Sequence, residues 1–193
     1  MTAHAKHFRL VQSLGDDQIG LEARAQIDDH METKIWLRLL ACSTQIEHQI
    51  RDLLRVRFAT SLHRFDYLAQ LDRHPEGLRM NVLSRYLMVT GGNVTGLTDQ
   101  LVKEGLVRRI VNPEDRRSWR VALTDKGRAE FAEMAAEHER WLVEMFKGLP
   151  AESRDALYEH LGHLRVHLAN RRVEVEAEAA PRVSKQKGGK PFD

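Results

Sequence analysis

Apolar residues recur at helical spacing along much of the chain. Over residues 29–57 they return every three or four positions, with charged side chains on the opposite face, which predicts one long amphipathic helix. A second helix is predicted after Ser61, a residue type favoured at helix N-caps, because apolar residues follow at every third position. Residues 74–77, which read His-Pro-Glu-Gly, end that helix, since proline and glycine interrupt helical hydrogen bonding.

Residues 78–127 hold two short helical patterns followed by a hairpin pattern. Helices are predicted over 80–87 and 91–104, with the turn between them at residues 90–92. Strands are predicted over 106–111 and 119–123, closed by a charged loop that contains Asn-Pro. This order is the plan of a winged helix-turn-helix, whose second helix can lie in the DNA major groove. The predicted fold class is therefore mainly α, with a small β-hairpin wing and a helical dimerisation region.

The second helix of this unit separates into an apolar and a polar side. Val94, Leu97 and Leu101 share one side, and at 100° per residue the polar side faces away from them, toward a groove. Arginines at the hairpin tip would reach the minor groove, whose negative potential attracts arginine. The candidate DNA-contacting residues are Thr90, Asn93, Thr95, Gly96, Asp99, Lys103, Asp115, Arg116, Arg117 and Arg120.

Composition and charge narrow the class of protein. With 42% hydrophobic and 30% charged residues, the 193-residue chain is typical of soluble globular proteins. Its net charge is only +2, but residues 103–128 hold eight Lys or Arg against four acids, a basic excess at the hairpin and its flanks. A single cysteine excludes an intramolecular disulfide, no apolar run approaches the ~20 residues that span a membrane, and the N-terminus lacks a signal-peptide core. The sequence therefore predicts a cytoplasmic protein without a membrane partner.

The helices that flank the winged unit have apolar faces too large for that unit to cover. Thr124 is the predicted N-cap of a further helix, which residues 148–150 end, and a last helix begins near Pro150. The leucines of that last helix, Leu157, Leu161, Leu164 and Leu168, follow a heptad-like seam. Pairing with the same helices of a second subunit would cover these faces. A two-fold homodimer would also place two recognition helices about one DNA turn apart, which matches a palindromic site.

These patterns divide the chain into five segments. They are an N-terminal arm (1–20), dimerisation helices (21–60), a winged helix-turn-helix domain (61–127), C-terminal dimerisation helices (128–172) and a tail (173–193). The arm is either flexible or a short helix that docks on a partner subunit. The tail, rich in Glu and Ala and then in Lys and Gly, is predicted to be disordered.

Five ordered motifs over roughly residues 31–172 resemble the MarR family of bacterial transcriptional regulators. The motifs are LSRYL (83–87), VTGLTDQL (94–101), EGLVRR (104–109), DRR (115–117) and LTDKG (123–127). The resemblance implies an obligate dimer with a winged helix in each subunit, and repression relieved by a small ligand bound between the dimerisation helices and the DNA-binding lobe. It places Asn93, Thr95 and Asp99 at groove-facing positions, with base readout on the first two, and Arg117 at the wing tip.

One position departs from the pattern of the family. Many relatives carry an arginine at the position of Gly96, where it can pair with the wing aspartate, here Asp115. Asp115 is therefore expected to pair with Arg116 or Arg120 instead. Glycine at this position also lets the helix backbone approach DNA closely.

Residues 77–95 are most similar to the branch of the family that controls catabolism of aromatic acids, and within it to repressors that respond to p-coumaroyl-CoA. The resemblance implies an effector that is an aromatic acid or its acyl-CoA thioester, such as a hydroxycinnamoyl-CoA, and no resident cofactor. The candidate effector-binding residues are Trp36, Arg38, His48, Arg51, Phe65 and Tyr67. Aromatic side chains would hold the ring and arginines the CoA phosphates, although the same residues also fit a core and a solvated face.

Other interpretations of individual residues stay open. His160, His163 and His167 share a helical face that could ligate zinc, but they flank the leucine seam, which favours interface residues. Cys42 could be a peroxide-sensing thiolate, but it lies on the apolar stripe without a group that lowers its pKa, which favours a buried residue. An enzyme is disfavoured because the sequence has no Gly-rich phosphate loop and no nucleophile elbow. A DNA-binding architectural protein without ligand control is the third class.

Overall fold

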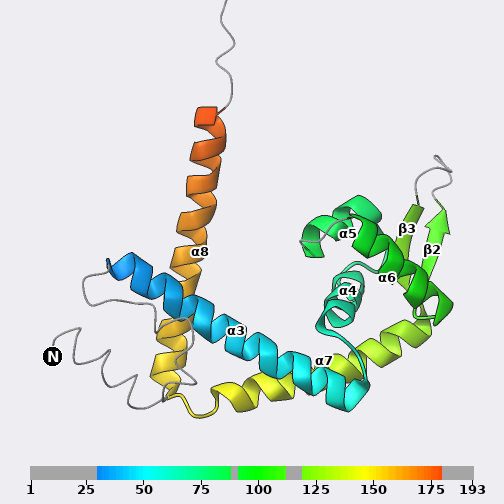
Figure 1. Cartoon of the computed structure of the whole chain (residues 1–193), viewed down its shortest axis with the longest axis horizontal. Helices are drawn as coiled ribbons and strands as arrows, with labels where there is room; N and C mark the ends of the chain where they lie inside the picture. The colour runs from blue at the N-terminus through cyan, green and yellow to red at the C-terminus, as the bar shows by residue number, and fades with distance from the viewer. Residues whose placement is uncertain (1–29, 88–90, 112–118, 180–193) are drawn as a thin grey trace, which may run out of the picture. The chain divides into compact units, whose positions relative to one another are not determined.

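The computed structural model describes residues 30–87, 91–111 and 119–179 (Figure 1). The chain divides into two compact units, Met1–Trp141 and Leu142–Asp193, which are described separately. The elements are α3 (Met31–Phe58), α4 (Leu62–Asp72), β1 (Leu78–Arg79), α5 (Met80–Leu87), α6 (Gly91–Lys103), β2 (Val107–Val111), β3 (Trp119–Leu123), α7 (Asp125–Phe146) and α8 (Ala151–Ala179). This mainly helical fold with a small wing is the predicted one.

The hairpin belongs to a three-stranded antiparallel sheet of order β1-β3-β2. β2 and β3 pair as predicted, from Val107 opposite Leu123 to Val111 opposite Trp119. The added strand, β1, follows Gly77, which has φ +82° and leaves no room for a side chain, since a Cβ would lie 2.8 Å from the Val121 carbonyl oxygen. Glycine therefore lets the chain enter the sheet beside β3.

The core of the first unit lies within the winged lobe, which we define as α4 to β3. The core of this lobe includes Leu68, Leu71, Leu83, Leu101 and Val121, each of which is at most 1% exposed. These residues come from α4, α5, α6 and β3, so the three helices and the sheet bury one shared set of apolar side chains. The winged lobe therefore has a hydrophobic core of its own.

A buried hydroxyl pair crosses that core from α4 to α6. Tyr67 and Thr98 are both fully buried, and their hydroxyl oxygens lie 2.6 Å apart. The Thr98 hydroxyl donates to the Val94 carbonyl at 2.7 Å, so Tyr67 must be the donor in the pair. Burial raises the pKa of Tyr67 to about 12, because the phenolate would be desolvated there.

The predicted helix caps are present in the structure. Ser61 accepts a hydrogen bond from the Arg64 amide at 3.3 Å at the start of α4, and Thr124 accepts one from the Gly127 amide at 3.0 Å at the start of α7. At the end of α6, Gly105 has φ +75°. Its amide donates to the Val102 carbonyl at 3.0 Å and the Leu106 amide donates to the Leu101 carbonyl at 2.9 Å, the hydrogen bonds of a Schellman motif.

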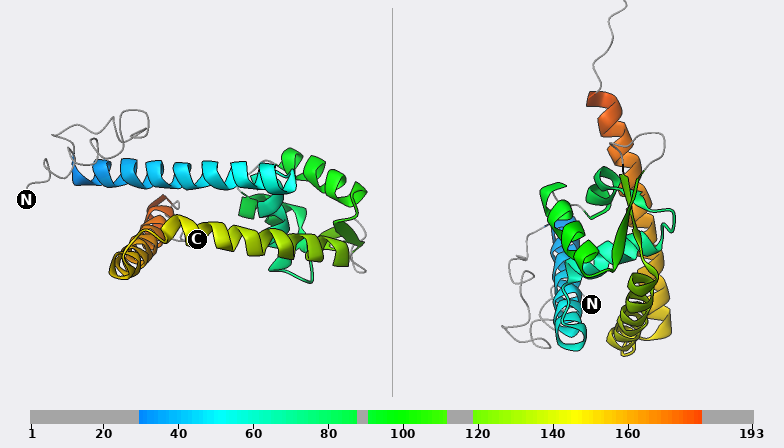
Figure 2. Two further views of the ribbon diagram at one scale, coloured as in Figure 1. Left: turned by 90° about the horizontal axis from the view of Figure 1, so that it is seen from below. Right: turned by 90° about the vertical axis from the view of Figure 1, so that its right-hand side faces the viewer.

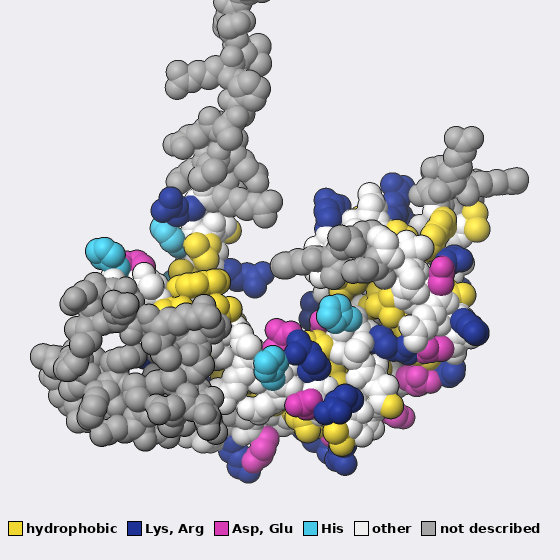
Figure 3. All heavy atoms as spheres, viewed as in Figure 1, with side chains coloured by type: hydrophobic (Ala, Val, Ile, Leu, Met, Phe, Trp, Pro, Cys, Tyr) yellow, Lys and Arg dark blue, Asp and Glu magenta, His cyan; other side chains and the backbone are white. Residues whose placement is uncertain are grey.

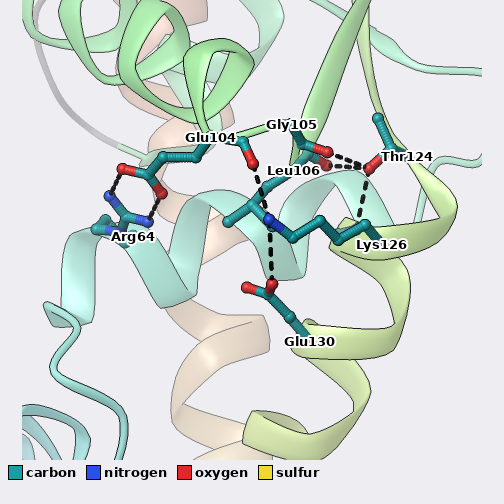
Figure 4. Close-up of polar contacts among 8 residues, drawn as sticks. Arg64, Glu104, Gly105, Leu106, Thr124, Lys126 and Glu130 are labelled. Carbon is teal, nitrogen blue, oxygen red and sulfur yellow. Dashed lines mark hydrogen bonds and ion pairs between the residues drawn. The ribbon is translucent and has the colours of Figure 1, made fainter.

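The base of the wing is joined to the start of α7 through backbone contacts (Figure 4). The Thr124 amide donates to the Leu106 carbonyl at 3.0 Å, and the Thr124 hydroxyl donates to the Gly105 carbonyl at 2.6 Å. A Cβ at Gly127 would lie 1.9 Å from the Leu106 carbonyl oxygen, so only glycine fits there. We call this arrangement the wing-base junction.

Helix α7 packs beside α4, as the views of Figure 2 show. The ring of Phe65 lies 5.5 Å from that of Phe131 and 4.7 Å from that of His138, measured between ring centroids. Farther along α7, Trp141 lies 6.2 Å from Phe58 at the end of α3. These aromatic contacts connect α3, α4 and α7 within the first unit.

Helix α3 is less buried than its apolar pattern predicts. The buried residues of α3 are Ile50 and Leu54, both in its second half, whereas Ile35 is 48% exposed. The prediction that Cys42 is buried is wrong, because its side chain is exposed. On the first half of α3, Ile35 and Cys42 of this stripe are exposed, whereas Leu39 is half-buried.

Helix α8 extends farther than the sequence pattern predicts. It continues to Ala179, so residues 173–179, assigned to a disordered tail, are helical. Glu and Ala are strong helix formers, and they continue the helix where the apolar seam ends. The N-terminal arm and residues 180–193 lie outside the described residues.

Candidate DNA-binding surface and ligand cavity

The predicted groove side of α6 faces solvent. Thr95, Gly96, Asp99 and Lys103 are exposed, whereas Val94 on the opposite side is 1% exposed. A Cβ built at Gly96 would meet nothing within 4 Å, so this part of the helix backbone is open to an approaching surface. The side chain of Asn93 and all of Thr90 and residues 115–117 lie outside the described residues.

Arginines gather on one face of the sheet. Arg79 of β1 lies directly opposite Arg120 of β3, and the register places Arg108 of β2 on the same face. All three side chains are exposed, and none forms an ion pair with another described residue. Figure 3 shows Lys and Arg side chains around this part of the molecule. Like charges directly opposite each other destabilise a sheet, and an anion between them would relieve the repulsion.

The predicted DNA-contacting residues include Arg120 of this cluster but neither Arg79 nor Arg108. Arg79 could not be found from the sequence because its strand, β1, has only two residues, too few to show an alternating pattern. Once the register is known, Arg79 joins the arginine face, which we define as Arg79, Arg108 and Arg120.

An ion pair connects α6 to the wing at a position that the sequence assigned to DNA. The Asp99 carboxylate pairs with Arg109 of β2, and the Arg109 guanidinium lies 4.6 Å from the ring centroid of Trp119 on β3. The family pattern expects an arginine at position 96 to make this kind of connection. Here Asp99, Arg109 and Trp119 connect the helix to the wing without it.

A second cluster connects the end of α6 to α4 and α7 (Figure 4). Arg64 and Glu104 form a bidentate pair, with one nitrogen–oxygen distance of 2.9 Å. The hydrogen bond raises the pKa of Arg64 and lowers that of Glu104. Lys126 of α7 donates to the backbone carbonyl of Glu104 at 3.0 Å. The C-terminus of α6 is thus held from both neighbouring helices.

A cavity of about 790 Å³ lies within the first unit, in the size range of small-molecule sites. Helices α3 to α7 all contribute to its wall. The lining residues are Ser43, Ile46, Glu47, Ile50, Leu62, His63, Asp66, Leu87, Val94, Leu97 and His138. The cavity therefore adjoins the inner side of α6, opposite the groove side.

The predicted effector-binding residues do not line this cavity. Trp36 is 60% exposed on the first half of α3, and Arg38 and His48 are exposed on the same helix. Arg51 pairs with Glu47. Phe65 and Tyr67 are buried in packing contacts, Phe65 against α7 and Tyr67 against Thr98.

The charges of the cavity wall are acidic and imidazole groups. Burial raises the pKa of Asp66, an effect that His63 and His138 oppose. Burial lowers the pKa of His138, which Asp66 opposes. Among the described lining residues, none is Lys or Arg.

The described part of the chain shows neither a metal-binding group nor a membrane-spanning helix. No group of three or more His, Cys, Asp or Glu side chains there is placed to hold a metal ion, and this includes His160, His163 and His167. No helix among residues 30–87, 91–111 and 119–179 is both long and apolar enough to cross a bilayer.

The fold, the exposed groove side of α6 and the adjacent arginines define a winged helix-turn-helix protein of the DNA-binding class. The model of the MarR family matches residues 60–118. The regulator PecS of Dickeya dadantii is 30% identical over 118 residues, which cover 60% of this chain and 71% of PecS. The chain belongs to the MarR family of transcriptional regulators.

Solved structures agree with this family. A MarR family regulator from Silicibacter pomeroyi is 32% identical, with a TM-score of 0.58 over 72% of this chain and 94% of that chain. CouR from Rhodococcus jostii RHA1, solved with p-coumaroyl-CoA, has a TM-score of 0.58 over 73% of this chain and 94% of CouR. CouR is only 22% identical, so this likeness shows the fold alone.

Proposed function

We propose that this regulator is a homodimeric repressor that binds palindromic DNA and is released when a small effector enters the cavity. The main support for this proposal is that α4 both lines the cavity and contacts α6. Its His63 and Asp66 line the cavity, while its Arg64 and Tyr67 hold α6. One helix thus contacts both the ligand site and the helix that would read DNA.

DNA contact is supported by the surface of the winged lobe. The exposed groove side of α6 suits the major groove, and the arginine face suits the phosphate backbone. Asn93, Thr95 and Arg117 remain predicted readout residues. Asp99, because it pairs with Arg109, is proposed to orient the wing rather than to contact bases.

Homodimer formation is supported by apolar side chains that lie exposed on two helices. On α8, Leu157, Leu161 and Leu168 are 40%, 39% and 56% exposed, and on α3, Met31 and Trp36 are 56% and 60% exposed. Exposed apolar faces of this kind mark association surfaces. A second copy of the chain would bury them.

Release by ligand follows from linkage between two sites that share α4. A ligand that binds better when α4 is displaced would favour positions of α6 that no longer match the half-sites. The apolar lining, with Ile50, Leu62 and Val94, suits an aromatic group. An effector from aromatic-acid metabolism, free or as an acyl-CoA thioester, is therefore the proposed class.

The test is fluorescence anisotropy on a selected palindromic duplex at several salt concentrations. Arg79→Ala and Arg120→Ala should each weaken binding and lower the salt dependence by about one released counterion. Arg140→Ala is the control, because Arg140 is an exposed arginine of α7 paired with Glu137. If the arginine-face variants bind like the control, the sheet does not contact DNA.

The same assay separates this function from that of an architectural DNA binder. Titration with aromatic acids and their CoA thioesters should release the duplex. Binding that shows no sequence preference and no response to any of these compounds would favour the architectural class.

A further inference from the structure

The acidic groups of the cavity wall differ in their partners. Glu47 is paired with Arg51, its neighbour on α3. Asp66 has no ion pair with a Lys or Arg among the described residues, and the charged or titratable groups that act on it are His63, His138 and Glu47. The wall thus offers a carboxylate acceptor and imidazole rings, but no guanidinium or ammonium among its described residues.

This wall is poorly suited to a negatively charged ligand. A ligand carboxylate beside Asp66 would be repelled, because a ligand that fills the cavity displaces the water that screens this exposed side chain. A phenol, amide or amine would instead donate a hydrogen bond to Asp66, and hydrogen bonds to charged acceptors are the strong ones. An aromatic ring would pack on Ile50, Leu62 and Val94.

We propose that the cavity takes an aromatic ligand whose enclosed part carries a hydrogen-bond donor and no negative charge, and that Asp66 selects against free carboxylates. The proposal rests on the proposed function, which makes this cavity the effector site. Of the two effector forms considered above, it favours the uncharged acyl group of a thioester over the free acid. Asp66 is the specificity-determining residue.

The test uses compounds that differ mainly in charge. Isothermal titration calorimetry of the full-length protein at neutral pH would compare 4-hydroxyphenylacetamide, 4-hydroxyphenylacetate and tyramine. The amide and tyramine should bind at least about tenfold more tightly than the acid, because a single like-charge repulsion near a protein surface is at least of that order. Equal binding, preference for the acid, or no binding of the amide and tyramine at millimolar concentrations overturns the proposal.

A matched pair of variants assigns the selectivity to one residue. Asp66→Asn keeps the size of the side chain and removes its charge, so the gap between acid and amide should shrink to about threefold or less. Asp72→Asn is the control on the same helix, because Asp72 pairs with Arg128 at 3.7 Å and does not line the cavity. A gap that persists in Asp66→Asn overturns the role of Asp66.

Measuring ligand binding without DNA distinguishes this proposal from the proposed function. If the amide binds with the expected preference but leaves DNA affinity unchanged, the cavity proposal stands and ligand-controlled repression fails. If only the free acid binds and releases DNA, repression stands and the cavity proposal fails.

Discussion

The winged lobe and α8 contain the same kind of apolar residue in opposite environments. In the lobe, Leu68, Leu71 and Leu83 are at most 1% exposed, whereas on α8 Leu157 and Leu161 are 40% and 39% exposed. Both regions show apolar spacing that predicts an amphipathic helix. In the lobe, neighbouring helices and the sheet cover the apolar side, whereas three of the four seam leucines of α8, Leu157, Leu161 and Leu168, stay exposed.

The spacing of apolar residues therefore identifies an apolar face but does not identify its partner. The lobe is held by its own core, by the Tyr67–Thr98 pair and by the Arg64–Glu104 pair. If a second copy covers α8, its contribution to stability must depend on protein concentration, whereas that of the lobe core must not.

Leu83→Ala should lower the free energy of unfolding by about 3 kcal/mol, the usual cost of a cavity in a closed core. Leu83 is fully buried in the lobe. Leu161→Ala, the same change on α8, should act mainly by weakening self-association. Denaturation at two protein concentrations, with sedimentation to follow association, separates the two effects. Equal losses that do not change with concentration would mean that α8 is covered within its own chain.

High pH should also affect the two regions differently. The pKa of Tyr67 is raised to about 12, so its stabilising effect is complete below the ordinary tyrosine pKa and is lost as pH rises toward 12. The loss should be about 2 to 3 kcal/mol, since each pKa unit corresponds to about 1.4 kcal/mol. Unfolding measured from neutral to alkaline pH should show this loss in the parent protein and not in Tyr67→Phe.

The control for alkaline pH is Tyr158→Phe on α8, where the tyrosine is 78% exposed. This variant should follow the parent protein at every pH. A flattened curve for Tyr158→Phe would mean that the tyrosine of α8 is buried in solution. Because it is exposed in the single chain, its partner would then belong to another copy.

The smallest expected effect is that of the ion pairs. Arg64→Gln should cost about 1 kcal/mol, because the Arg64–Glu104 pair is bidentate but its side chains are still 20% and 36% exposed. The coupling, measured by a double-mutant cycle with Glu104→Gln, should fall in acid. The pKa of Glu104 is lowered, so its stabilisation is present above the ordinary pKa and is lost as pH falls through the folded-state value.

The matched pair outside the lobe is Lys147–Glu144, with both side chains 71% exposed. Lys147→Gln should leave stability nearly unchanged. A coupling as large as that of Arg64 and Glu104 would show that exposure does not decide the strength of these pairs.

Periodicity and local chemistry predicted the helices, the hairpin and the caps at Ser61 and Thr124. The same reasoning missed β1 and therefore Arg79, because a two-residue strand has no period. It also placed Cys42 in a core, because an apolar stripe does not reveal whether anything covers it.

The cavity could not be predicted from the sequence for a different reason. Its wall combines residues of α3, α4, α5, α6 and α7 that are far apart in the chain. No sequence motif marks Asp66. Its proposed role in ligand selection depends on the cavity and on the positions of His63 and His138 around it. The Asp99–Arg109 pair likewise depends on how α6 meets the wing.

The wing-base junction makes it possible to engineer the wing at its other end. The contacts of Gly105, Leu106, Thr124 and Gly127 hold the hairpin at its base, so they support its strand register from the end opposite residues 112–118. We expect that loops from other regulators, grafted between Val111 and Trp119, would change operator preference while the contacts at the base of the wing are kept.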